Sequence, residues 1–90
     1  MDDEIKLIRA SGRADKAERL LNDETFKEAF AALEASYIEA WRMSPPMASD
    51  QREKLHLAIN VLGKVKDHIG KIVQNGKLAK AELAMKAKAA

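Results

Sequence analysis

The sequence predicts an all-α protein: an antiparallel hairpin of two helices, at residues about 23–43 and 49–75, with shorter N- and C-terminal helices in a small bundle. Apolar side chains recur at steps of three and four residues along most of the chain, which is the spacing of one face of an amphipathic helix. A double proline, Pro45-Pro46, interrupts this pattern once, and two helices joined by so short a loop pack antiparallel. Ninety residues are enough for one small domain, residues 1–90.

The N-terminal segment is helical, but the sequence leaves its continuity open. Acidic residues stand in its first turn, where the positive end of the helix dipole favours them. Ile5 and Ile8 lie one turn apart, and Ser11-Gly12 follows as a point where a helix can break. The apolar stripe then resumes at Ala14, Ala17 and Leu21. The segment is therefore either one kinked helix or two.

The clearest helix begins after Asp23, a residue type that caps helix N-termini by accepting a backbone hydrogen bond. Pro45 disfavours a helical conformation at Ser44, so we expect the helix to end within residues 43–48. Its apolar face comprises Phe26, Ala29, Phe30, Leu33, Tyr37, Ala40 and Trp41.

The second long helix is expected to start with Ser49 or Asp50 as its cap. Its core positions follow alternating steps of three and four: Leu55, Ala58, Leu62, Val65, Ile69 and Ile72. Four more apolar residues lie outside this row: Leu57, Ile59, Val61 and Val73. The apolar face is thus wider than a two-stranded coil needs, and we expect this helix to contact more than one neighbour.

Asn75-Gly76 predicts the end of this helix, because both residue types favour a C-terminal cap. No alternating runs flank the dipeptide, so it does not indicate a strand hairpin. The helical pattern resumes as a shorter C-terminal helix with Leu78, Ala81 and Met85 on one side. Residues 86–90 are expected to fray.

The sequence contains no recognisable catalytic or metal-binding constellation. Cysteine is absent, so neither a disulfide nor a thiolate metal site can form. The two histidines, His56 and His68, lack a third converging ligand, and no phosphate-binding or dinucleotide-binding glycine motif occurs. We therefore expect a non-enzymatic protein with no catalytic residues, no metal, no cofactor and no small-molecule substrate.

Six residues are candidates for contacts with another chain: Trp41, Tyr37, Gly63, Gly70, Leu57 and Val61. Gly63 and Gly70 share one helix face, and each costs roughly 1 kcal/mol relative to alanine inside a helix. Close approach of another helix or subunit would explain them, and a tolerated weak point on a solvated face is the alternative. Trp41 either packs the corner near Leu55 or anchors an interface, where tryptophan is enriched.

Basic side chains gather towards the C-terminus. Residues 1–24 carry a net charge of −2, residues 25–63 carry −1, and residues 64–90 carry +5. Lysines that neutralise phosphates give DNA affinity independent of sequence, although no helix-turn-helix pattern and few aromatic residues accompany them. The alternative is that they keep a helical tail soluble. The candidates for phosphate contacts are Lys64, Lys71, Lys77, Lys80, Lys86 and Lys88.

The segments "LLND", "YIEAWRMSP", "REKL" and "GKLAKAEL" carry a resemblance to a group of short helical proteins encoded in tailed-phage and prophage genomes. The resemblance covers residues about 13–83. Those proteins are mostly uncharacterised, and their genes lie among virion-assembly and DNA-packaging genes. The resemblance implies a phage context and attaches no catalytic residue to the chain.

These observations lead us to expect a phage-encoded assembly or adaptor protein, acting as an oligomer, with a role as a virion or DNA-packaging accessory subunit. Its partner would be itself or another phage or virion protein. The alternatives are a small regulator or inhibitor that binds a host protein, and a nonspecific DNA-binding module that uses the C-terminal lysines. The acidic N-terminus and the lack of an apolar run of about 20 residues predict no membrane association. The expected location is the host cytoplasm or the virion.

Overall fold

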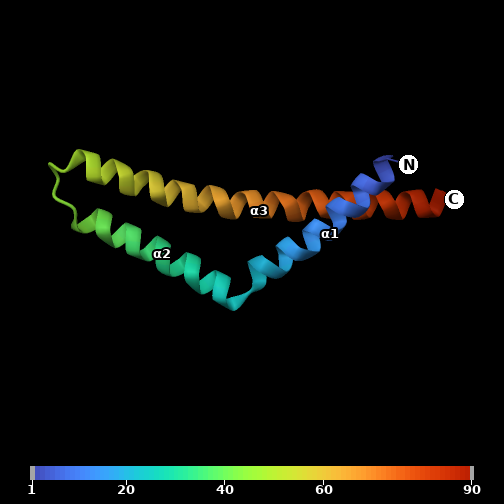
Figure 1. Cartoon of the computed structure of the whole chain (residues 1–90), viewed down its shortest axis with the longest axis horizontal. Helices are drawn as coiled ribbons and strands as arrows, with labels where there is room; N and C mark the ends of the chain where they lie inside the picture. The colour runs from blue at the N-terminus through green and yellow to red at the C-terminus, as the bar shows by residue number, and fades with distance from the viewer. Residues whose placement is uncertain (1, 90) are drawn as a thin grey trace.

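The computed structural model describes residues 2–89 and contains three helices: α1 (Asp2–Asn22), α2 (Glu24–Met43) and α3 (Ser49–Ala89) (Figure 1). No strand occurs among the described residues. The all-α class is therefore confirmed, and the predicted hairpin corresponds to α2 and residues 49–75 of α3.

α1 is one continuous helix that runs through Ser11-Gly12 without a break. No described glycine has a positive φ, so Gly12 keeps a helical backbone. A glycine inside a helix weakens it by about 1 kcal/mol relative to alanine but does not stop it when the flanking residues continue the pattern. This settles the choice between one helix and two.

Both ends of α2 lie where the sequence predicts them. The Asp23 side chain accepts a hydrogen bond from the Phe26 backbone N–H at 2.8 Å, which confirms the N-cap. The helix ends at Met43, and Ser44 has an extended backbone before Pro45. The break within residues 43–48 is therefore confirmed, and its cause is the restriction that a proline imposes on the preceding residue.

The predicted cap of α3 is wrong by one position. The helix begins at Ser49, and the carbonyl of Ala48 accepts the backbone N–H of Arg52 at 3.0 Å. Ser49 and Asp50 thus lie inside the first turn. Asp50 still stabilises the helix there, because its charge faces the positive end of the helix dipole.

The predicted helix end at Asn75-Gly76 is also wrong. α3 continues through both residues to Ala89, so residues 77–89 extend α3 and do not form a separate, shorter helix. Gly76 has a negative φ and is buried beneath α1. Its role is therefore tertiary: the absence of a side chain lets two helices approach. Residues 86–89 form the last turn of α3, and Ala90 lies outside the described residues.

The molecule is elongated. α3 forms its long axis, α1 crosses the C-terminal half of α3, and α2 diverges from α3 with distance from the loop (Figure 1). The principal extents are 66 × 25 × 15 Å, and the radius of gyration is 19.1 Å, against about 12 Å for a compact domain of this length. The buried apolar residues are Ala14, Ala17, Val73 and Ala79, and no large described side chain is fully buried.

Candidate interaction surfaces

The crossing of α1 and α3 is the tightest packing in the described part of the chain, and it depends on small residues. A β carbon added to Gly76 would collide with the side chain of Ala14 and would lie 2.9 Å from the Ala10 carbonyl oxygen. Ala17 and Ala79 are buried on either side of this point. The crossing fixes α1 on α3, so it sets which faces of both helices remain exposed.

An ion pair joins the same two helices at the surface. The Lys80 ammonium donates a hydrogen bond to the Asp15 carboxylate. This hydrogen bond, together with the positive charge of Lys80 and a smaller effect of Arg19, lowers the pKa of Asp15. Both side chains are about half exposed, so solvent screens the pair. The ion pair therefore contributes more to the orientation of α1 on α3 than to the stability of the fold.

Trp41 lies at the corner between α2 and α3, where it contacts Arg52. The Arg52 guanidinium carbon lies 4.4 Å from the centre of the Trp41 ring. Arg52 Nη1 also donates to the Trp41 carbonyl oxygen at 3.2 Å and to Ser44 Oγ at 2.8 Å, and Ser44 Oγ donates to the same carbonyl at 2.6 Å. Arg52 therefore supplies a hydrogen-bond donor to a carbonyl at the C-terminal end of α2, where helix carbonyls lack partners within the helix. Trp41 itself is still 39% exposed to solvent.

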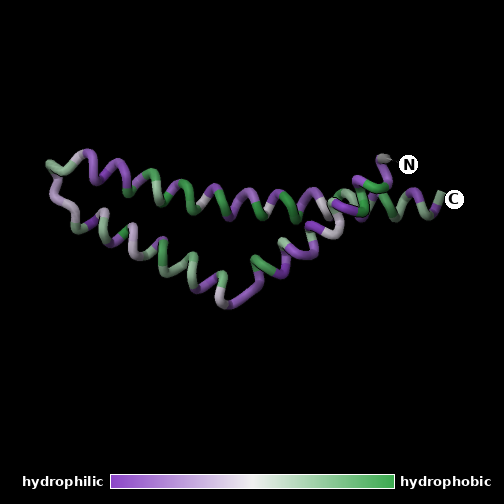
Figure 2. The backbone as a smooth tube through the Cα atoms, viewed as in Figure 1, coloured by the Kyte–Doolittle hydropathy of each residue, from purple (hydrophilic) through white to green (hydrophobic). Residues whose placement is uncertain are grey.

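Large apolar side chains remain exposed on all three helices, and apolar positions continue along the length of α3 (Figure 2). Four of them gather on the α2–α3 hairpin: Leu33 at 44% exposure, Leu57 and Val61 at 55%, and Val65 at 41%. We call these four residues the hairpin apolar face. The sequence pattern placed Leu33 and Val65 in the core, but the divergence of α2 from α3 leaves both uncovered.

The six candidate interface residues have different surroundings. Leu57 and Val61 belong to the hairpin apolar face, Trp41 lies at the corner, and Tyr37 is half-buried on α2. A β carbon added to Gly63 or Gly70 would meet nothing within 4 Å. A close approach within this chain therefore does not account for these two glycines. Contact with another subunit and a tolerated weak point on a solvated face are the two explanations left. The sequence pattern missed the contacts that Gly76 and Arg52 make between different helices.

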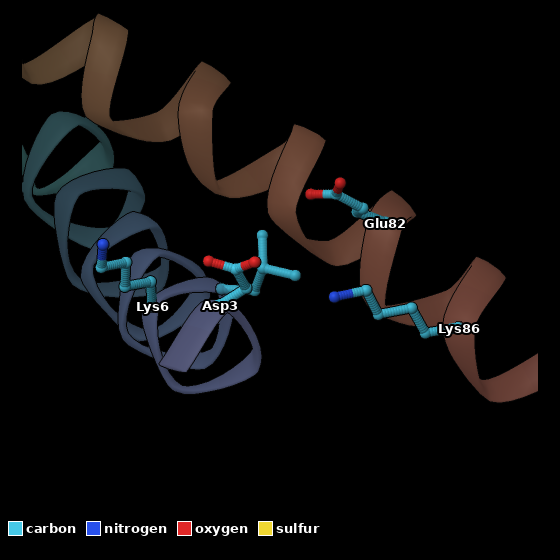
Figure 3. Close-up of a pocket in the computed structure, with 5 residues that line it drawn as sticks. Asp3, Lys6, Glu82 and Lys86 are labelled. Atoms are coloured by element: carbon cyan, nitrogen blue, oxygen red, sulfur yellow. The ribbon is translucent and has the colours of Figure 1, made fainter. Parts of the chain in front are cut away.

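The six candidate lysines are exposed. Because each residue advances about 100° around α3, the six do not share one face of the helix. Lys80 pairs with Asp15. Lys86 borders a pocket of about 310 Å³ with Glu82 of α3 and with Asp3 and Lys6 of α1, so acidic groups lie among the basic ones (Figure 3). Lys64 borders a second pocket with Glu34 and Asp67. The remaining three are Lys71, Lys77 and Lys88.

Neither histidine is part of a metal-binding group in the described residues, where no cluster of three or more histidine or carboxylate ligands occurs. His56 Nε2 lies 3.2 Å from the Asn60 side-chain nitrogen, one turn away on α3. Within residues 2–89, no helix combines the length and the apolar character needed to cross a membrane.

No family model, curated protein or solved structure that was compared with the chain matches it.

Proposed function

We propose that the chain is a non-enzymatic, phage-encoded assembly or adaptor protein that acts as an oligomer, serving as a virion or DNA-packaging accessory subunit. The exposed hairpin apolar face is the observation that carries this proposal. Its four side chains are each more than 40% exposed, while the buried apolar core of the described residues consists of three alanines and one valine.

The energetics of burial support association. Full burial of one leucine or valine side chain contributes roughly 1.5–3 kcal/mol. A 90-residue chain without cysteine has few other sources of stability, and small domains of this kind commonly rely on association. An exposed apolar patch of several neighbouring side chains is typical of a protein–protein contact surface.

The phage context rests on the resemblance of "YIEAWRMSP" and "REKL" to short phage proteins. It is tested by the neighbouring genes and by mass spectrometry of purified virions. Flanking genes for portal, terminase or capsid proteins are expected. A chromosomal neighbourhood without phage genes would contradict the context without affecting the association.

The oligomer is tested by gel filtration with multi-angle light scattering across a range of protein concentrations. A defined mass at a multiple of the chain's 10.0 kDa is expected. A monomer at every concentration would contradict the proposed assembly role and would favour the regulator class, in which a host protein covers the apolar face.

A nonspecific DNA-binding module is the second candidate, because residues 64–90 carry a net charge of +5 and their six candidate lysines are exposed. Such binding weakens steeply with salt, since it depends on the release of counterions. Fluorescence anisotropy with a short duplex at low and at moderate salt tests it. An absence of binding even at low salt would eliminate this candidate.

A further inference from the structure

We propose that a second copy of the chain covers the hairpin apolar face in a two-fold dimer, with the two α3 helices packed antiparallel about Val61. This inference rests on the proposed association and specifies its geometry. It is carried by the position of the exposed apolar row, its spacing, the surface area of the chain and the charges that flank the row.

The row lies on a part of α3 that this chain does not cover. Leu55 and Leu62 are half-buried and mark the side of α3 that faces α2. Val65, Val61 and Leu57 lie progressively further round the helix from that side, since each residue advances about 100°. All three are more than 40% exposed. The apolar sector of α3 is thus wider than α2 can cover.

Leu33 extends the face onto α2. Phe30 and Tyr37 are half-buried and mark the side of α2 that faces α3, and Leu33 is displaced from them in the same rotational sense as Val65 is displaced on α3. In two antiparallel helices, displacements of the same sense lie on the same side of the pair. The four residues therefore border one side of the hairpin.

The spacing of the row fits a two-fold axis. Leu57 and Val65 lie four residues before and four residues after Val61. In an antiparallel pair centred on Val61, each Val61 meets its own copy and each Leu57 meets the partner's Val65. An interface related by a two-fold axis must be complementary to itself in this way, and this row meets that condition.

The surface area of the chain matches the need of a stable dimer. Its accessible surface is 7179 Å², about 2,000 Å² more than a compact folded chain of its mass exposes. A standard specific interface buries about 800 Å² on each partner. One copy therefore has ample surface for a dimer interface, and a second copy supplies an apolar row of matching length.

The charges beside the row are complementary in the same register. An apolar groove of about 280 Å³ lies between α1 and α3, lined by Ile72 among others and edged by Arg13 and Lys16. Ile72 lies eleven residues after Val61, and Asp50 lies eleven residues before it. The antiparallel pairing thus brings the partner's Asp50 to this basic edge, where opposite charges steer the two copies into register.

Cysteine cross-linking tests the axis directly, because the chain has no cysteine of its own. A residue on a two-fold axis meets its own copy, so Val61→Cys is expected to form a disulfide-linked dimer under mild oxidation. Gln74→Cys is the matched control, since Gln74 is exposed on the opposite side of α3 and is expected to give only background cross-linking. Non-reducing electrophoresis is the readout, and circular dichroism confirms that both variants are folded.

A second pair of variants keeps the test independent of disulfide formation. Val61→Glu is expected to shift the light-scattering mass from dimer to monomer, whereas Gln74→Glu keeps the dimer. An associated wild type in which Val61→Cys cross-links no better than Gln74→Cys would overturn the two-fold arrangement and leave the assembly role standing. A monomeric wild type would overturn both.

Discussion

At the scale of single residues, Gly76 is a position where the fold leaves no room for a side chain. Substitution to alanine would raise intrinsic helix propensity by about 1 kcal/mol, but the added methyl group meets Ala14 and the Ala10 carbonyl oxygen. Overpacking of this kind costs about 1–3 kcal/mol. Because some of the atoms in this collision belong to the backbone of α1, they cannot move aside as a flexible side chain could. We therefore expect the steric cost to exceed the gain in helix propensity.

We therefore predict that Gly76→Ala lowers the free energy of unfolding by up to about 2 kcal/mol, the surplus of overpacking over helix propensity. Urea denaturation followed by circular dichroism measures it. Gly63→Ala and Gly70→Ala are the matched controls, since both positions are open within the chain. An increase in stability for Gly76→Ala would mean that α1 does not cross α3 at this residue.

The same controls test the two glycines themselves. Gly63 and Gly70 lie on the side of α3 opposite Val61, since each residue advances about 100° around the helix. We predict that the double alanine variant is more stable by about 1–2 kcal/mol, from helix propensity alone, with an unchanged light-scattering mass. A change in mass would instead assign these glycines to a contact between subunits.

Asp15 gives the fold a dependence on pH. Its pKa is lowered in the folded chain by the hydrogen bond and charge of Lys80, so the charged carboxylate favours folding. This contribution is complete above the unfolded pKa of about 4 and is lost as the pH falls through the lowered folded value. Asp15→Asn should therefore lower the urea midpoint at pH 7, and its difference from wild type should shrink in acid. Glu28→Gln, which also removes one exposed carboxylate, on α2, is the matched control.

At the scale of helices, the corner of the hairpin depends on one cation. Arg52 stacks on Trp41 and donates to the Trp41 carbonyl and to Ser44. We predict that Arg52→Ala lowers the free energy of unfolding by about 1–3 kcal/mol, from lost hydrogen bonds and the lost cation–π contact. Arg52→Lys should retain part of the effect. Trp41 fluorescence during urea denaturation reports both variants, and a wild-type midpoint for Arg52→Ala would show that Ser44 caps α2 alone.

The helices also show which features of this fold a sequence can predict. The two ends of α2 follow from Asp23 and Pro45, because each of these residues acts on backbone groups within three residues of itself. The predicted helix end at Asn75-Gly76 is wrong because the dipeptide resembles a C-terminal cap locally. In the structure Gly76 instead packs against Ala14, more than sixty residues earlier in the chain. The Trp41–Arg52 contact was missed for the same reason, since it crosses a loop whose path no periodicity reveals.

At the scale of the whole molecule, the exposed apolar surface predicts that stability depends on concentration. If a second copy covers this surface, folding and association are linked, and mass action raises the melting temperature as protein concentration increases. We predict a steady rise over a hundredfold range of concentration, measured by circular dichroism. Val61→Glu should abolish this dependence while remaining helical. A melting temperature independent of concentration in the wild type would contradict the linkage.

The unbroken course of α3 through Asn75-Gly76 has a mechanical consequence. A helix rises about 1.5 Å per residue, so the C-terminal end of α3 lies roughly 40 Å from Val61. In the proposed dimer the C-terminal ends of the two α3 helices would therefore project in opposite directions, roughly 80 Å apart by the same rise. Such a dimer would be a rigid, elongated particle with two identical ends. It would hold its two ends at a fixed separation, and a break at Gly76 would make that separation variable.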